Sequence, residues 1–119
     1  MNSRRKELLE QFKQMKPDMG IFMIRSQTSH KCFLETSHNL RGRINSTLFK
    51  LNGGVHPNRE LQKEWREQGA DNFSIEILET LKYDEDESKT DYREELTILQ
   101  MVWEDRLSGE NALFYSKNI

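Results

Sequence analysis

The stretch from Met19 to Arg43 reads MGIFMIRSQTSHKCFLETSHNLRGR, and its pattern decides the fold that we expect. Two short runs, 20–24 and 31–35, are rich in β-branched and aromatic residues, which is typical of strands. The polar residues 27–30 between them indicate a short hairpin loop. The stretch therefore predicts a pair of antiparallel strands that leads at once into a segment with two arginines.

A helix is expected directly after this hairpin. Ser37 or Asn39 can cap its N-terminus by accepting a hydrogen bond from a backbone N–H group. The helix would run to about Leu51, because the Asn-Gly-Gly sequence at 52–54 is a strong stop in which glycine tolerates the left-handed conformation. The two arginines therefore fall near the start of this helix, beside the predicted sheet.

The remaining sequence predicts further helices and one more strand. The expected elements are a helix over 3–15 that ends at Pro17, a helix from about Pro57 to Gly69, a strand over 72–79, and a long helix over 90–107. Leu113, Phe114 and Tyr115 in the tail are expected to dock on the body of the protein. This order favours a small α+β fold, with a three-stranded antiparallel sheet flanked by helices and an added N-terminal helix.

Length and composition limit the class of protein. The 119 residues favour a single domain over 1–119, with a helical extension over 1–18, a core over 19–107 and a tail over 108–119. No apolar run approaches the ~20 residues of a membrane helix, and the start lacks the apolar core of a secretion signal. The single Cys32 excludes an internal disulfide. We therefore expect a cytoplasmic protein with no membrane partner.

Charge is divided unequally along the chain. Residues 1–68 carry 13 Lys and Arg against 7 Asp and Glu, whereas residues 69–119 carry 5 against 13. The net charge of −2 hides this division. One half of the protein could meet phosphate groups while the other presents an acidic face, although ordinary solvated helices would show the same counts.

An ordered set of residues within this pattern resembles the GIY-YIG nuclease family. The set is Gly20-Ile-Phe22, ten further residues, Phe33-Leu-Glu35, Ser37, Asn39-Leu40 and Arg43, followed by His56-Pro-Asn58, Leu61-Gln62, Trp65, Gly69, Asp71-Asn72-Phe73 and Glu76-Ile-Leu-Glu79. No single piece is specific, but the order and spacing cover most of the chain, from Gly20 to about Trp103. The resemblance implies a fold and an activity, which is metal-dependent hydrolysis of a nucleic-acid phosphodiester.

The resemblance also assigns roles by position. Arg43 matches the family's arginine, and Glu94 matches its metal-binding glutamate, with Glu95 as the alternative if the register slips by one residue. Phe22 and Phe33 fall where the family has two tyrosines. The set of possible site residues also includes His56, which stands where the family often has a histidine, and Asn111, which matches a late asparagine loosely. Mg²⁺ is the cofactor implied if the site is functional.

Elementary chemistry agrees with these roles. Arginine offers a planar, permanently charged fork to phosphate oxygens. A carboxylate together with water and substrate oxygens suits Mg²⁺. Read alone, however, Arg43 would be a surface helix residue, Glu94 a solvent-facing charge, and Phe22 and Phe33 part of the core.

Several positions depart from the family pattern. Phe22 and Phe33 both lack a hydroxyl, so neither can accept or relay a proton, and general-base help is worth about 100- to 10,000-fold in rate. Glu35 replaces a glycine and places a negative charge beside the expected phosphate path, where it could pair with Arg43. Thr47 stands where the family commonly has a histidine. We therefore separate the fold, which the apolar spacing supports, from the activity, which depends on polar groups.

Three functions remain open from the sequence. The first is a degenerate GIY-YIG-like domain, weakened or inactive in catalysis, that binds nucleic acid, with DNA preferred over RNA, in a regulatory or accessory role through Arg41, Arg43, Lys31 and Lys50. The second is an active metal-dependent endonuclease that uses His38, Glu35 or a metal-bound hydroxide as its base. The third is a protein-interaction module, a homodimer included, that uses the apolar face of the N-terminal helix or the acidic segment 84–87.

Overall fold

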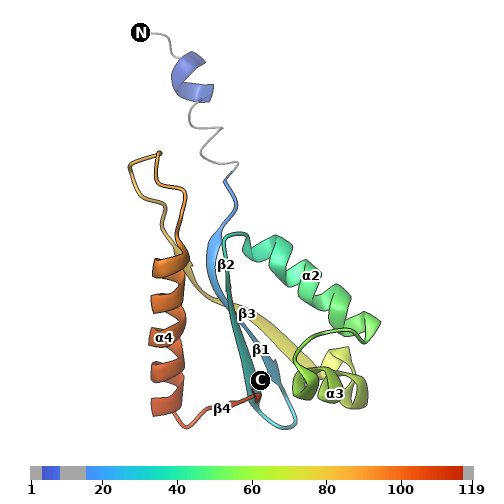
Figure 1. The fold of residues 1–119 in the computed structure, drawn as a ribbon. Coiled ribbons are helices and arrows are strands. Elements are labelled where there is room, and N and C mark those ends of the chain that lie inside the picture. Colours follow the sequence, from blue (N-terminus) through green and yellow to red (C-terminus); the bar gives the residue numbers. More distant parts are fainter. Residues whose placement is uncertain (1–3, 9–15, 117–119) are drawn as a thin grey trace.

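The computed structural model describes residues 4–8 and 16–116 of the chain (Figure 1). Residues 4–8 are helical, whereas the rest of the predicted N-terminal helix, 9–15, lies outside the described residues. Beyond Pro17 the structure has strands and helices close to the expected positions. They are β1 Met19–Ser26, β2 Lys31–Ser37, α2 Leu40–Gly53, α3 Arg59–Gln68, a short 3-10 helix Ala70–Asn72, β3 Phe73–Leu81, α4 Arg93–Gly109 and β4 Leu113–Phe114.

The sheet has four strands in the order β3-β1-β2-β4. Strand β1 pairs antiparallel with β2 and β3, whereas β4 pairs parallel with β2. The prediction of a three-stranded antiparallel sheet was therefore one strand short. The reason is that β4 is only two residues long and forms because the tail docks beside β2, where the Tyr115 N–H donates to the Cys32 carbonyl at 3.0 Å. A strand this short has no alternating pattern of its own.

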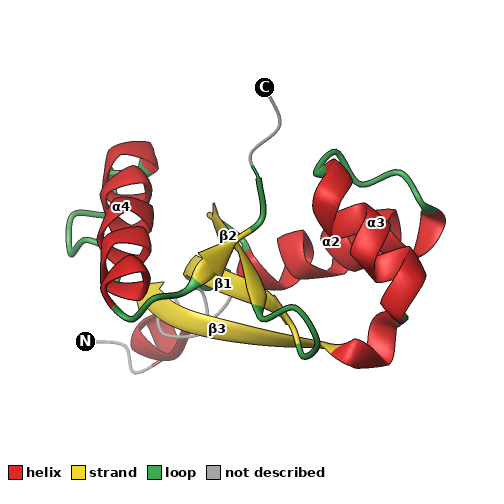
Figure 2. Cartoon of the chain, turned by 90° about the horizontal axis from the view of Figure 1, so that it is seen from below, coloured by secondary structure: helices red, strands yellow, loops and turns green. Residues whose placement is uncertain are grey.

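The helices cover the two faces of the sheet separately (Figure 2). On one face, Ile21 and Met23 of β1 pack with Leu96 and Leu99 of α4. On the other face, Phe22 and Ile24 pack with residues of α2 and α3, among them Leu40, Leu51, Leu61 and Trp65. Successive residues of β1 thus point to opposite layers, and both layers bury apolar side chains. The α+β fold class is confirmed.

The predicted helix boundaries have identifiable caps. The Asn39 side chain accepts a hydrogen bond from the Gly42 N–H at 3.0 Å and caps α2, which settles the choice between Ser37 and Asn39. Gly54 ends α2 in the left-handed conformation, with φ of 77°. Asn58 caps α3 in the same way as Asn39, through the Leu61 N–H at 3.0 Å. Local polar side chains therefore fix where these helices begin.

Helix α4 begins three residues later than predicted. Asp91 accepts a hydrogen bond from the Arg93 N–H at 3.0 Å, and the Tyr92 hydroxyl accepts one from the Asp84 N–H at 2.9 Å. These local bonds hold the preceding residues in a loop. Tyr92 is nevertheless buried with Leu96 and Leu99, as the predicted apolar stripe requires. None of the helices within 4–8 and 16–116 is long and apolar enough to span a membrane.

Gly20 is required where β1 passes close to β3. A Cβ atom built on Gly20 would lie 2.1 Å from the Glu79 carbonyl oxygen and 2.8 Å from the Thr80 Cα atom, both backbone atoms. We expect Gly20→Ala to lower the free energy of unfolding by about 2–4 kcal/mol, because the strands must separate to admit the methyl group. Urea denaturation followed by circular dichroism measures this.

The matched control is Gly109→Ala, because no atom lies within 4 Å of the Cβ built at that position. Its effect should stay within about 1 kcal/mol, in the stabilising direction, since alanine is the better helix former. An equal loss of stability in both variants would contradict the assignment of a special role to Gly20.

Candidate functional site

Three motif positions lie on the sheet face that α2 and α3 cover. Phe22 on β1 is opposite Glu35 on β2 in the strand register. Phe33 and Glu35 are two residues apart on β2, so their side chains share this face. Phe22 is fully buried, whereas Phe33 and Glu35 are half-buried at the margin of the core. The first aromatic position is therefore a core residue and the second stands at the edge of the site.

Arg43 pairs with Glu35. Its Nη1 atom lies 3.8 Å from the Glu35 Oε2 atom, and the side chains are 47% and 28% exposed. Burial raises the pKa of the Glu35 carboxyl above its ordinary value, and this effect is opposed by the charges of Arg43 and Lys50. An ion pair this exposed contributes about 0–1 kcal/mol and is screened by salt. Arg43 is therefore held by a carboxylate that a stronger anion can displace.

His56 stands beside Phe33 in the loop between α2 and α3. The two rings meet edge to face with their centroids 5.3 Å apart. The His56 Nδ1 atom accepts a hydrogen bond from the Asn58 N–H at 3.0 Å, which leaves the proton of the neutral ring on Nε2. Burial lowers the pKa of His56, so the ring is neutral at pH 7. In this state His56 orders the entry to α3 and is no cation for phosphate.

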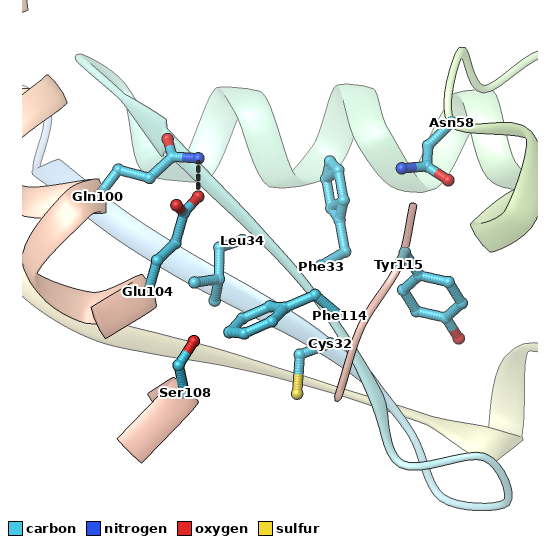
Figure 3. Close-up of a pocket in the computed structure, with 9 residues that line it drawn as sticks. All are labelled: Cys32, Phe33, Leu34, Asn58, Gln100, Glu104, Ser108, Phe114 and Tyr115. Atoms are coloured by element: carbon cyan, nitrogen blue, oxygen red, sulfur yellow. Dashed lines mark hydrogen bonds between the residues drawn. The ribbon is translucent and has the colours of Figure 1, made fainter. Parts of the chain in front are cut away.

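A cavity of about 310 Å³ opens along the outer edge of β2, between α4 and the start of α3 (Figure 3). Phe33, Asn58 and Tyr115 line it from one side, and Gln100, Glu104 and Ser108 line it from α4. The Gln100 Nε2 atom donates to the Glu104 Oε1 atom at 3.0 Å. Gln100, Glu104 and Ser108 are thus the α4 side chains that share this cavity with Phe33, and our sequence interpretation missed them.

A sequence signal for Gln100 exists. Gln100, Glu104 and Ser108 recur every four residues, so they form one polar stripe beside the apolar stripe of α4. Our interpretation placed the functional carboxylate near the start of the helix and overlooked this stripe. The helix face that meets β2 can be identified only once the packing of α4 is known.

Glu94 and Glu95 lie away from this cavity. Glu94 is exposed in the first turn of α4, which packs on the opposite face of the sheet from the α2 helix of Arg43. Glu95 forms an ion pair with Lys89. Neither glutamate is among the residues that line the cavity. The structure therefore brings Arg43 to Glu35, and it leaves Glu94 on another layer.

The donor set around these residues does not fit a bound Mg²⁺ ion. Within residues 4–8 and 16–116, no three His, Cys, Asp or Glu side chains gather in a group that could hold a metal. Mg²⁺ prefers carboxylate and water oxygens, and the one carboxylate among the lining residues of the cavity, Glu104, already accepts a hydrogen bond from the Gln100 amide.

The other predicted site residues have separate positions. Lys31 pairs with Glu60 of α3 at 2.9 Å, which raises the pKa of the lysine and removes it as a free phosphate contact. Arg41 is exposed and Lys50 half-buried, both on α2. Asn111 has a φ of 63° and donates its N–H to the Ser108 carbonyl at 3.1 Å, so it closes the turn after α4.

Comparison with known proteins identifies the fold. No protein-family model and no curated protein sequence matches the chain. Among solved structures, the catalytic domain of the homing endonuclease I-TevI is similar with a TM-score of 0.64 and 18% identity, over 83% of this chain and 99% of that domain. A glutamate-to-alanine mutant of the intron endonuclease I-TevI catalytic domain gives a TM-score of 0.64 and 19% identity, over 83% and 92%. The chain therefore has a GIY-YIG-like, nuclease-like fold.

The two motif phenylalanines should respond differently to an added hydroxyl. Phe22→Tyr would place the hydroxyl in a fully buried site and should lower the free energy of unfolding by about 1–3 kcal/mol, the cost of an unsatisfied polar group. Phe33→Tyr should cost less than about 0.5 kcal/mol, because the ring borders an open cavity where water can reach it.

Urea denaturation of both variants beside the wild type measures the difference. The two substitutions add the same atom to the same residue type, so each controls for the other. Equal costs would show that the two positions do not differ in solvent access as described.

Proposed function

We propose that the chain is a DNA-binding domain of GIY-YIG-like fold in which phosphodiester hydrolysis is weakened or lost. The observation that carries this proposal is the ion pair between Arg43 and Glu35. It keeps a cation at the margin of the sheet and places a carboxylate where an anionic substrate would approach. Such a site favours reversible binding over catalysis and suits a regulatory or accessory role.

The charge of α2 supports contact with phosphate groups. The helix carries Arg41, Arg43 and Lys50 and contains no Asp or Glu. Helix α4, on the opposite face, carries four acidic and two basic residues. Phosphate contacts supply most of the affinity of non-specific DNA binding, so α2 is the face on which DNA would dock. DNA is the preferred partner because the similar solved structures are homing and intron endonuclease domains.

The loss of reactive groups supports weak catalysis. Phe22 and Phe33 offer no hydroxyl to position or deprotonate water. The neutral ring of His56 already uses its Nδ1 atom as an acceptor for the Asn58 N–H. On α4, the carboxylate that lines the cavity, Glu104, already accepts a hydrogen bond from the Gln100 amide. The polar groups that remain can bind and orient a phosphate without supplying a general base.

Binding to a duplex of about 20 base pairs tests the proposal directly. Arg43→Ala should weaken binding about 3- to 10-fold and reduce the slope of log K against log salt by about 1. Glu35→Gln should strengthen binding about 2- to 5-fold, because Arg43 is then released from its carboxylate. Fluorescence anisotropy at several salt concentrations measures both effects.

The matched control is Arg93→Ala, which removes an arginine that is paired with Asp91 on the α4 side. It should leave DNA affinity nearly unchanged. Binding that is absent at low salt, or equal losses in Arg43→Ala and Arg93→Ala, would overturn the proposal.

We expect supercoiled plasmid to stay intact with Mg²⁺ or Mn²⁺. Cleavage that disappears in both Arg43→Ala and Glu94→Ala would instead establish the active endonuclease.

DNA affinity should rise as the pH falls from about 7 to about 5. The raised pKa of Glu35 means that this carboxyl takes up its proton at a higher pH than an ordinary glutamate, and the protonated form no longer neutralises Arg43. The lowered pKa of His56 delays its protonation to lower pH. Glu35→Gln should flatten the profile. The same rise in that variant would assign the effect to other groups.

A further inference from the structure

Helix α3 has two faces of different charge. Its carboxylates on one side are engaged within the protein: Glu60 pairs with Lys31 and accepts from the Ser116 hydroxyl at 3.1 Å, and Glu64 accepts from the Gln68 amide at 2.9 Å. Its basic residues lie at 59, 63 and 66, which is helical spacing for one face. Two of the three acids of α3, Glu60 and Glu64, are thus engaged within the protein, whereas Lys63 and Arg66 are exposed.

These cations border a second cavity, of about 390 Å³, between the end of α2 and α3. Its lining includes Arg59, Lys63 and Arg66, with Gly54, His56, Gln62 and Glu67. The buried Gln62 is fully engaged, since it accepts from the His56 N–H at 2.9 Å and donates to the Leu51 carbonyl at 3.0 Å. The buried Gln62 at the bottom of the cavity is therefore uncharged and already hydrogen-bonded. The exposed residues around the opening are three cations and one carboxylate, Glu67.

Arg66 is placed over the end of α2. A Cβ atom on Gly54 would lie 2.8 Å from the Arg66 Nη2 atom, so the guanidinium crosses the backbone where glycine leaves room. Gly54 has a φ of 77°, which glycine adopts at no steric cost. The chain thus keeps a planar phosphate-binding group at this cavity, on the same layer as α2.

We propose that the cavity between Gly54 and α3 is a second contact for the phosphodiester backbone of DNA, with Lys63 and Arg66 as its principal cations. This inference rests on the proposed function and extends the interface from α2 onto α3. Arg43 and Gly54 are eleven residues apart along α2, or about 16 Å at the helical rise. That span is short enough for phosphates a few nucleotides apart on the same strand to reach both sites.

Lys50 lies between the two sites. Its charge acts on Glu35 at one site and on His56 at the other. The cations Arg43 and Lys50 of α2 and Lys63 and Arg66 of α3 thus form a series on the helical layer that covers one face of the sheet. The Glu67 carboxylate at the cavity opposes the attraction of these cations for phosphate, so removing its charge should strengthen DNA binding.

The test compares two double variants that each remove two positive charges. Lys63→Ala with Arg66→Ala should weaken binding to the 20-base-pair duplex about 10-fold or more and reduce the salt slope by about 2. The control is Arg25→Ala with Lys82→Ala, two exposed cations on β1 and after β3, outside α2 and α3. It should lose less than about 2-fold in affinity. Circular dichroism confirms that both double variants are folded.

Further variants separate charge from structure. Arg66→Lys keeps the charge and should retain most of the affinity, and Glu67→Gln should increase it. Equal losses in the two double variants would overturn the inference, and so would DNA binding that depends on Arg43 but is unchanged by Lys63→Ala with Arg66→Ala. A wild type that binds no DNA at low salt would overturn the proposed function together with this inference.

Titration with inorganic phosphate tests whether the cavity binds the phosphodiester backbone of DNA or a free phosphate ion. Titration followed by NMR should show weak, unsaturated shifts at Lys63 and Arg66 in the millimolar range, because one phosphate lacks the further contacts on α2. Saturable binding of phosphate in that range, with DNA affinity unaffected by the double variant, would assign the cavity to a free phosphate ligand and overturn the inference.

Discussion

Strand β1 is buried on both faces, and the arrangement of every other element follows from this constraint. It pairs with β2 on one side and β3 on the other, so its side chains must alternate between two apolar layers. Ile21 and Met23 take the α4 layer, and Phe22 and Ile24 take the layer of α2 and α3. A shift of one residue would exchange the two sets, so the packing of β1 also fixes which face carries Glu35 and Phe33.

The fold and the chemistry respond to different parts of the sequence. Phe22 fills a fully buried aromatic core position without a hydroxyl, so the packing of the fold does not require one there. Glu35 is also compatible with the fold, because a half-buried carboxylate at the sheet margin finds Arg43 at 3.8 Å. The same pair changes the chemistry, since it balances the cation before any substrate arrives. A scaffold can thus remain intact while its reactive groups are exchanged.

The local elements were predictable and the site was only partly so. Asn39 was one of two predicted caps and Gly54 fell within the predicted stop, because such residues act on their neighbours; the cap formed by Asn58 was not predicted. The pairing of Glu35 with Arg43 was anticipated as a possibility, because the resemblance placed both residues beside the expected phosphate path. Gln100 was missed, since its place in the same cavity as Phe33 depends on how α4 packs across some sixty residues of intervening chain. Strand β4 was missed for the same reason, because its partner is distant in sequence.

The fold places the basic helix α2 and the acidic helix α4 on opposite faces of the sheet, so the uneven charge of the sequence is also divided in space. The sheet and its two apolar layers thus separate the charges of the two helices. The Debye length at physiological salt is about 8 Å, and the acidic layer is therefore largely screened from a ligand on α2. The net charge of −2 thus underestimates the attraction of the α2 face for phosphate. If the proposed DNA binding holds, repulsion on the α4 face would orient the duplex toward the α2 face.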